Sequence, residues 1–337
     1  MTSDLLRKLH ASRAFDPTPS RSQMAELHVP FDLLLGSTDY ESRFRQAVMR
    51  GDRIALIGAS GAGKSSTTEF VLNGTNVGSI APLRIRMGMQ TDAIVAEPST
   101  FPSLLVSSIA RQLDRDKKVR KADQLVRGGT HKRPVTLSLG GGISWLTGEL
   151  ALELGSVVTE PLTGEDVVEQ AIKVLNLIRR RGLEPTLVFD DTDQWIRRPG
   201  IGTDPEPRIA AFFGPTLRMI ADRLPAASVI AVHTDYVQSP HFDQAHDFLD
   251  TRITLPNLDR SLVGKLVTRR ARNACDVRDL RTDQFIRRNA LDRLFDLYLE
   301  RNSVRRMLRN LNDALVRACD DGASAVETAH VVAAIAG

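Results

Sequence analysis

A glycine-rich loop between an apolar run and a helix is the feature that most restricts how this 337-residue chain can fold. Residues 58–65 read Gly-Ala-Ser-Gly-Ala-Gly-Lys-Ser and match the pattern G-x-x-x-x-G-K-[ST]. The apolar run 53–57 predicts a buried parallel strand, and a helix is expected to begin at Lys64. Glycines let successive backbone N–H groups point at phosphate oxygens, and the helix adds its positive N-terminus. The motif therefore predicts a strand–loop–helix unit that holds a triphosphate.

The predicted ligands of this loop are ATP and Mg²⁺. The Lys64 ammonium would contact the β- and γ-phosphates, and the Ser65 hydroxyl would coordinate Mg²⁺. Backbone N–H groups of the loop and of the first helical turn would surround the phosphates. The residues predicted to bind nucleotide here are Gly58, Ala59, Ser60, Gly61, Ala62, Gly63, Lys64, Ser65 and Ser66.

A second apolar run ends in two carboxylates. Residues 187–189 read Leu-Val-Phe and are followed by Asp190 and Asp191. In proteins with such a loop, a carboxylate at the end of a buried strand holds Mg²⁺, and Asp190 is expected to do so here. Asp191 would orient the attacking water as a base, or else it caps a helix that starts near Thr192. Because aspartate is shorter than the glutamate common at this place, we expect slow hydrolysis.

Strand and helix patterns alternate up to about residue 256, and helices alone continue from there. This order predicts a doubly wound α/β core with a parallel sheet and a small all-α domain after it, here called the lid. Residues 1–30 are expected to form an arm or linker, 31–256 the core, and 257–337 the lid. Within the core, 111–147 combines a basic stretch with a β-hairpin insertion around Gly140–Gly142. Helices are expected at about 102–113, 166–181, 209–224, 259–275, 282–301, 304–320 and 326–335, and further strands at about 83–87, 186–189 and 228–233.

The net charge of +4 is unevenly distributed along the chain. Residues 111–133 hold nine Lys/Arg against three Asp, and 259–317 hold fifteen Lys/Arg against eight acids. Such asymmetry suits contact with a polyanion such as DNA. A solvated basic face, with arginines that bind nucleotide or a neighbouring subunit, accounts for it equally well.

Membrane and exported classes are disfavoured. The sequence has no run of about 18 apolar residues, and its N-terminus is charged early and lacks an apolar core, so neither a membrane span nor a signal peptide is expected. Cys275, Cys319 and the seven histidines lack metal-ligand spacing. We expect ordinary thiols in a reducing cytoplasm and no metal other than Mg²⁺.

Together these motifs resemble the AAA+ superfamily of P-loop ATPases, from about Phe31 to the C-terminus. The strand 229–232 is similar to the family's sensor-1 strand. That likeness implies that the polar residue at its end, His233 or Thr234, lies near the γ-phosphate and the attacking water. It also implies an ATPase that closes its site between subunits.

Three further segments carry the resemblance. Residues 302–311 are similar to the sensor-2 helix, which implies that Arg305, or alternatively Arg306, contacts the nucleotide. Asn302 stands where the family usually has glycine. Arg252 lies where the initiator-like branch places the arginine that reaches a neighbouring subunit's nucleotide, although an ordinary structural arginine is an equal alternative. Residues 29–36 resemble the segment that packs on adenine.

The motif pattern is closest to the initiator, transposition-regulator and STAND-like ATPases. The leading hypothesis is an ATPase that assembles with ATP into a ring or filament and acts on DNA or a DNA-bound protein partner. The alternative is a STAND-like signalling switch, set by nucleotide binding, whose effector is a separate protein. A small-molecule kinase is disfavoured because it would not explain the helices after the core.

Overall fold

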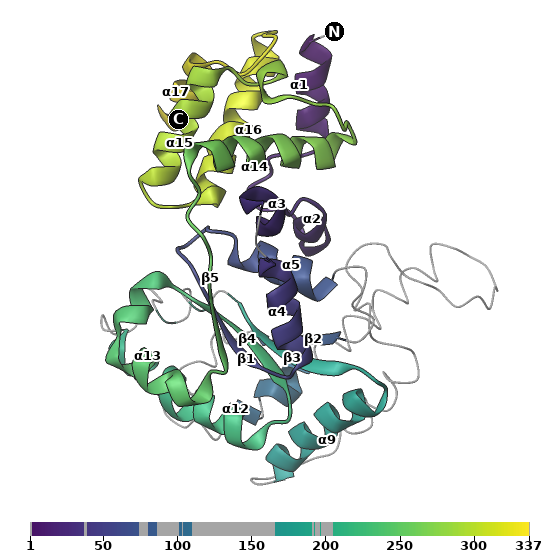
Figure 1. Cartoon of the computed structure of the whole chain (residues 1–337), viewed down its shortest axis with the longest axis vertical. Helices are drawn as coiled ribbons and strands as arrows, with labels where there is room; N and C mark the ends of the chain where they lie inside the picture. The colour runs from purple at the N-terminus through teal and green to yellow at the C-terminus, as the bar shows by residue number, and fades with distance from the viewer. Residues whose placement is uncertain are drawn as a thin grey trace, which may run out of the picture. The chain divides into compact units, whose positions relative to one another are not determined.

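The computed structural model describes residues 2–36, 39–73, 80–85, 101–102, 104–109, 166–190, 192, 196 and 205–336 (Figure 1). The chain divides into two compact units that are each discontinuous in sequence. One unit comprises residues 1–44, 57–74 and 254–337, and the other comprises 45–56 and 75–253. The glycine-rich loop thus groups with the lid. The predicted domain boundaries near residues 30 and 256, between arm, core and lid, remain a prediction.

A five-stranded parallel sheet forms the centre of the second unit, which confirms the predicted α/β class. Its order is β2-β3-β4-β1-β5. The outer strand β2 pairs with β3, and β3 pairs with β4, both in parallel register. The bounds are β1 Arg53–Ile57, β2 Ile80–Arg84, β3 Glu184–Phe189, β4 Ala227–Val232 and β5 Thr251–Thr254.

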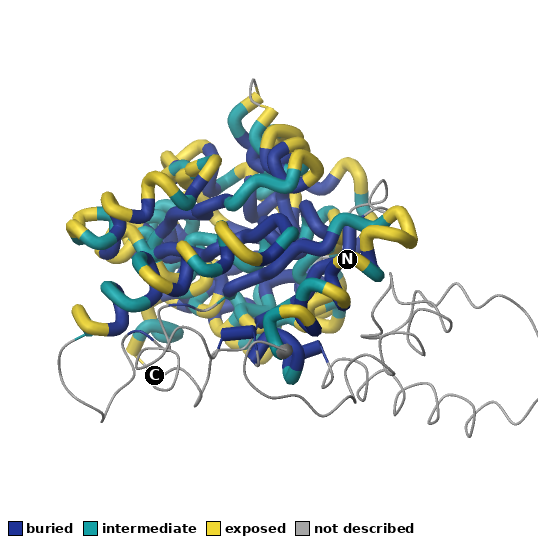
Figure 2. The backbone as a smooth tube through the Cα atoms, turned by 90° about the horizontal axis from the view of Figure 1, so that it is seen from below, coloured by how far each residue is buried: buried dark blue, intermediate teal, exposed yellow. Residues whose placement is uncertain are grey.

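Burial explains why these runs are apolar throughout. Every residue of β4 is buried, and so is every residue of β3 after its first. Strands covered on both faces need continuous rather than alternating hydrophobicity. In Figure 2 the buried backbone runs through the interior, while exposed residues collect on turns and outer helix faces.

Helices flank this sheet, and one predicted helix is interrupted. The helix α9, Asp166–Arg180, packs on β3 as its amphipathic pattern predicts. The helix expected over 209–224 consists instead of α11 Glu206–Ala211, a π-helical turn Phe212–Thr216 and α12 Leu217–Arg223. Pro215 lies inside the π turn and cannot donate a backbone hydrogen bond there. A short helix, α13 Pro240–Gln244, comes after β4.

The lid is helical, as predicted. It consists of α14 Arg260–Cys275, α15 Arg288–Leu299, α16 Val304–Asp320 and α17 Thr328–Ala336. Asp259 begins α14 by accepting a hydrogen bond from the Leu262 N–H at 2.8 Å. The Tyr298 hydroxyl accepts from the buried Leu258 N–H at 2.8 Å and ties α15 to the segment that enters the lid.

The N-terminal segment differs from the expected arm or linker, because it contains short helices. These are α1 Thr2–Ala11 and α2 Arg21–Glu26; α3 Phe31–Leu35 and α4 Tyr40–Met49 follow after this segment. In Figure 1, α1 lies beside α14 and α16 of the lid. Leu6 and Leu9 are fully buried. Arg270 of α14 donates to the carbonyl oxygens of Ala14 at 2.7 Å and Asp16 at 3.0 Å.

Some predicted features lie outside the described residues. They are Asp191, the basic stretch 111–133 and the hairpin around Gly140–Gly142. Of the helix expected over 102–113, residues 101–102 and 104–109 are helical. In the part of the chain that the structure describes, no helix is both long and apolar enough to cross a bilayer.

Candidate nucleotide-binding site

The loop 58–63 connects β1 to α5, Lys64–Asn73, as the motif predicts. Gly61 and Gly63 have φ values of 77° and 114°, a region that residues with a Cβ rarely adopt. The glycines therefore let the chain turn sharply into the helix. Because α5 begins at Lys64, the backbone N–H groups of its first turn lie next to this bend.

Lys64 is buried within the loop that it ends. Its ammonium donates to the carbonyl oxygens of Gly58 at 2.6 Å and Ala59 at 3.0 Å, and the residue is 9% exposed. A buried cation at the N-terminus of a helix is complementary to a multiply charged anion.

The first turn of α16 contacts the same loop through its backbone. The Arg305 N–H donates to the Gly61 carbonyl at 3.0 Å. Ser303 caps α16 by accepting from the Arg306 N–H at 3.3 Å, and Asn302 before it has a φ of 47°. This positive φ explains why asparagine can stand where the AAA+ pattern has glycine, since both tolerate the left-handed region.

The two candidate arginines of α16 differ in their partners. Arg306 forms an ion pair with Glu300 at 2.8 Å. Arg305 is exposed, and among the described residues no carboxylate pairs with it. Arg305 therefore has the guanidinium that remains free to meet a phosphate, which favours it over Arg306.

Replacing Gly61 with alanine is expected to destabilise the protein and weaken the contact between loop and lid. A Cβ at Gly61 would lie 2.3 Å from the Ser303 Oγ and 3.0 Å from the Arg305 Cβ, in addition to the backbone strain at positive φ. Gly182→Ala is the matched control, because Gly182 has a φ of 76° but nothing within 4 Å of its Cβ position. Strain alone costs about 1 kcal/mol. In urea unfolding, Gly61→Ala should lose clearly more stability than Gly182→Ala, and equal losses would contradict the clash.

The ends of three parallel strands bring the other predicted residues to one edge of the sheet. Because β1, β3 and β4 run in the same direction, their carboxyl ends share that edge. Half-buried Asp190 follows β3 directly, and His233 follows β4. The Thr192 hydroxyl donates to the Ala231 carbonyl of β4 and so connects these two ends.

His233 caps the short 3-10 helix Thr234–Gln238. Its Nδ1 accepts from the Asp235 N–H at 3.2 Å and lies 3.4 Å from the Asp235 carboxylate. The alternative of a capped strand end is therefore present in the structure. Only Nε2 of His233 is left for another partner, and Thr234 lies within the helix that it caps.

Arg252 lies on β5 and stacks on an aromatic ring. Its guanidinium carbon is 4.8 Å from the ring centroid of Phe242, which is fully buried and meets Phe213 edge-on at 5.2 Å. Arg252 itself is exposed, and no carboxylate among residues 205–336 forms an ion pair with it. The ring fixes the direction of a charge that stays available to solvent.

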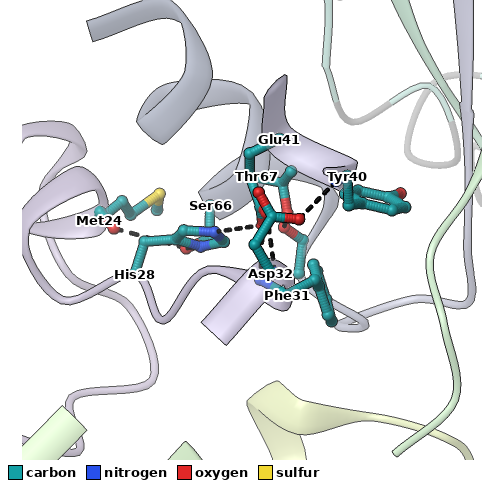
Figure 3. A network of polar contacts seen from close by, with 9 residues as sticks. Met24, His28, Phe31, Asp32, Tyr40, Glu41, Ser66 and Thr67 are labelled. Carbon is teal, nitrogen blue, oxygen red and sulfur yellow. Dashed lines mark hydrogen bonds and ion pairs between the residues drawn. The ribbon is translucent and has the colours of Figure 1, made fainter. Parts of the chain in front are cut away.

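Sequence reasoning missed a buried polar cluster at the first turn of α5 (Figure 3). His28 places Nδ1 3.0 Å from the Ser66 Oγ and Nε2 3.4 Å from the Glu41 Oε1. Burial lowers the pKa of His28, although Glu41 opposes that effect. Burial raises the pKa of Glu41, but hydrogen bonds from His28 and two backbone N–H groups outweigh it and leave that pKa below its usual value. No spacing in the sequence links these residues, because each lies in a different element.

No protein-family model matches the sequence, and no curated protein matches it. Among solved structures, the ORC1 protein of Aeropyrum pernix in complex with DNA is similar, with a TM-score of 0.50 and 15% identity over 92% of this chain. The ORC2 protein of Aeropyrum pernix in ADPNP–ADP complexes gives a TM-score of 0.48 and 12% identity over 88% of this chain. This chain covers 65% of the length of each of these two. The likeness to the ORC1 structure shows a common fold.

Proposed function

We propose that this chain, which has the fold of the AAA+ P-loop ATPases of the initiator type, is a slow ATPase that assembles with ATP and acts on DNA or a DNA-bound protein. The observation that carries the proposal is the pair of contacts at the loop. Lys64 lies buried against the loop carbonyls, and α16 of the lid donates a hydrogen bond to Gly61. A triphosphate in this loop would therefore also meet the first turn of α16.

The residues present fit ATP with Mg²⁺. Backbone N–H groups and Lys64 supply donors for phosphate oxygens, and Arg305 supplies a further cation from the lid. The Ser65 hydroxyl and the Asp190 carboxylate are hard oxygen ligands, which suit Mg²⁺ better than a softer metal. When bound, Mg²⁺ would neutralise charge on the β- and γ-phosphates.

Hydrolysis would depend on three further residues, of which the structure describes His233 and Thr234. We infer that Asp191 takes the proton of the attacking water and that His233 or Thr234 orients the γ-phosphate. Since His233 already uses Nδ1 as a cap, Nε2 is the atom that would reach the substrate. The short side chain of Asp191 and the use of His233 Nδ1 as a helix cap both favour slow turnover.

Contact with DNA would rest on charge rather than on base recognition. The lid carries exposed arginines on several of its helices and turns, and these would bind phosphates without regard to sequence. They include Arg269, Arg278, Arg281, Arg287, Arg288, Arg301, Arg309 and Arg317. The ORC1 structure with DNA belongs to a longer protein, so the way that this chain meets DNA is a proposal of its own.

ATP turnover and particle size, measured with and without duplex DNA, test the proposal. We expect ATP to increase particle size, DNA to stimulate turnover, and Asp191→Asn to abolish turnover while ATP binding persists. The DNA effect should fall steeply with salt, because phosphate contacts release counterions. Assembly with ATP but without DNA binding, together with negligible turnover, would instead favour the STAND-like switch.

A further inference from the structure

We infer that His28 is a positioning residue for the phosphate-binding loop and that it acts by accepting a hydrogen bond from the Ser66 hydroxyl in the first turn of α5. This inference rests on the proposed binding of ATP. Figure 3 shows His28 between Ser66 on one side and Glu41 on the other. Ser66 follows Ser65 directly, and Ser65 follows Lys64, so His28 holds the turn that carries both of those phosphate-side groups.

The direction of each hydrogen bond follows from Glu41. Its Oε1 accepts from the Phe31 N–H at 2.6 Å and its Oε2 from the Asp32 N–H at 3.1 Å, so an ionised carboxylate suits this place. An ionised Glu41 needs a donor from His28, and Nε2 is the atom that faces it. In the neutral ring Nδ1 is then an acceptor, because only one nitrogen carries a proton. Ser66 then donates its one hydroxyl proton to His28 at 3.0 Å rather than to the Met24 carbonyl, the more distant acceptor at 3.4 Å.

This assignment changes the predicted role of Ser66. Its hydroxyl proton is used inside the protein, and Oγ also lies 3.4 Å from the Met24 carbonyl at the end of α2. Ser66 can still offer its backbone N–H to a phosphate. Its side chain instead ties α5 to residues 24–32, a segment that the sequence places in or next to an arm.

The cluster is buried and packs against α5. The side chains of His28 and Glu41 are 5% and 4% exposed, and the His28 ring lies 4.7 Å from the Phe70 ring one turn further along α5. The helix α2 also packs along α5. Since small displacements of a group that contacts phosphate cost much of its binding energy, loss of this tie should weaken ATP binding.

Two isosteric replacements separate this role from simple core packing. In His28→Asn the side-chain amide lies near the position of Nδ1 and can keep the bond with Ser66, whereas in His28→Gln it lies near Nε2 and can keep the bond with Glu41. Both variants remove the ring from the Phe70 contact. We expect His28→Gln to weaken ATP binding about tenfold, the value of one lost hydrogen bond, and His28→Asn to bind within about threefold of the unmodified chain.

A double-mutant cycle gives the second readout. Ser66→Ala should weaken ATP binding as much as His28→Gln, and the double variant should lose no more than either single one. Arg272→Met serves as the structural control, because Arg272 donates to the Leu280 carbonyl at 2.7 Å within the lid and is not among the charged groups that shift the pKa of His28. It should lower the melting temperature while ATP affinity stays near normal.

The outcomes separate this inference from the proposed function. If the unmodified chain binds no ATP, the proposed function fails. If that chain binds ATP but His28→Gln and His28→Asn bind it equally well, or lose affinity equally, His28 acts only in packing and the inference is wrong. Additive losses in the double variant would also overturn it.

Discussion

Replacing Lys64 with alanine is expected to weaken ATP binding by about a hundredfold or more, because a charged donor to two phosphates is lost from a buried place. Lys64 is 9% exposed and is held 2.6 Å from the Gly58 carbonyl, so its ammonium is preorganised where water competes little. The same change removes a cation that the fold must otherwise bury. We therefore expect Lys64→Ala to lose most of its ATP affinity while its melting temperature changes little.

Isothermal titration calorimetry with ATP measures the affinity, and thermal unfolding of the same preparations measures the stability. Lys265→Ala is the matched control, since Lys265 is exposed on α14 of the lid. It should leave both quantities unchanged. Affinity within a few fold of the unmodified chain in Lys64→Ala would contradict the assignment of residues 58–65 as the phosphate site.

The sheet could be predicted from the sequence because its strands are buried on both faces. Continuous apolar runs mark β1, β3 and β4, and the motif after β1 specifies the turn into α5. The π turn around Pro215 was missed, because the apolar spacing of 209–224 continues through it. The spacing of apolar residues indicates which side of a helix is apolar, but it does not reveal one extra residue in a single turn.

The N-terminal helices were missed for a different reason. Pro17 and Pro19 interrupt the segment, and each helix is too short to be stable alone. Leu6 and Leu9 are buried where α1 packs on α14 and α16, and Phe15 is buried where it stacks on Phe285. Contacts between residues more than 250 positions apart, such as Arg270 with Ala14, have no signature in local sequence.

The candidate site divides along the same line. The loop directly follows the apolar strand β1, and Asp190 directly follows the apolar strand β3, so both could be located from the sequence. Asn302 has the left-handed backbone conformation that is expected at its place in the motif. The side chain that holds Ser66 could not be found in this way, since His28 lies 38 positions away from it. Local motifs thus predict which groups would meet phosphate, whereas the groups that hold them in place depend on tertiary packing.

Arg252→Ala is expected to lower ATP turnover of the assembled protein by about a hundredfold or more, with ATP binding nearly unchanged. The guanidinium lies 4.8 Å from the Phe242 ring, is exposed, and has no ion pair among the described residues near it, so its position suits a charge offered to another subunit. An arginine that only stabilised β5 would change the melting temperature more than the rate. Arg218→Ala, at an exposed arginine of α12, is the matched control and should leave turnover intact.

Mixing two inactive variants shows whether Arg252 acts on a neighbour. Asp190→Asn disables the nucleotide site of its own subunit but keeps Arg252, whereas Arg252→Ala keeps the site and lacks the arginine. If the arginine completes a neighbouring site, a one-to-one mixture regains activity wherever an intact site meets an intact arginine, which is about a quarter of the contacts in a randomly mixed closed assembly. If Arg252 acts within its own subunit, or only as a structural arginine of β5, no contact in the mixture combines the two intact halves. Turnover should then stay at the level of the separate variants, and the assignment of Arg252 to a shared site would be wrong.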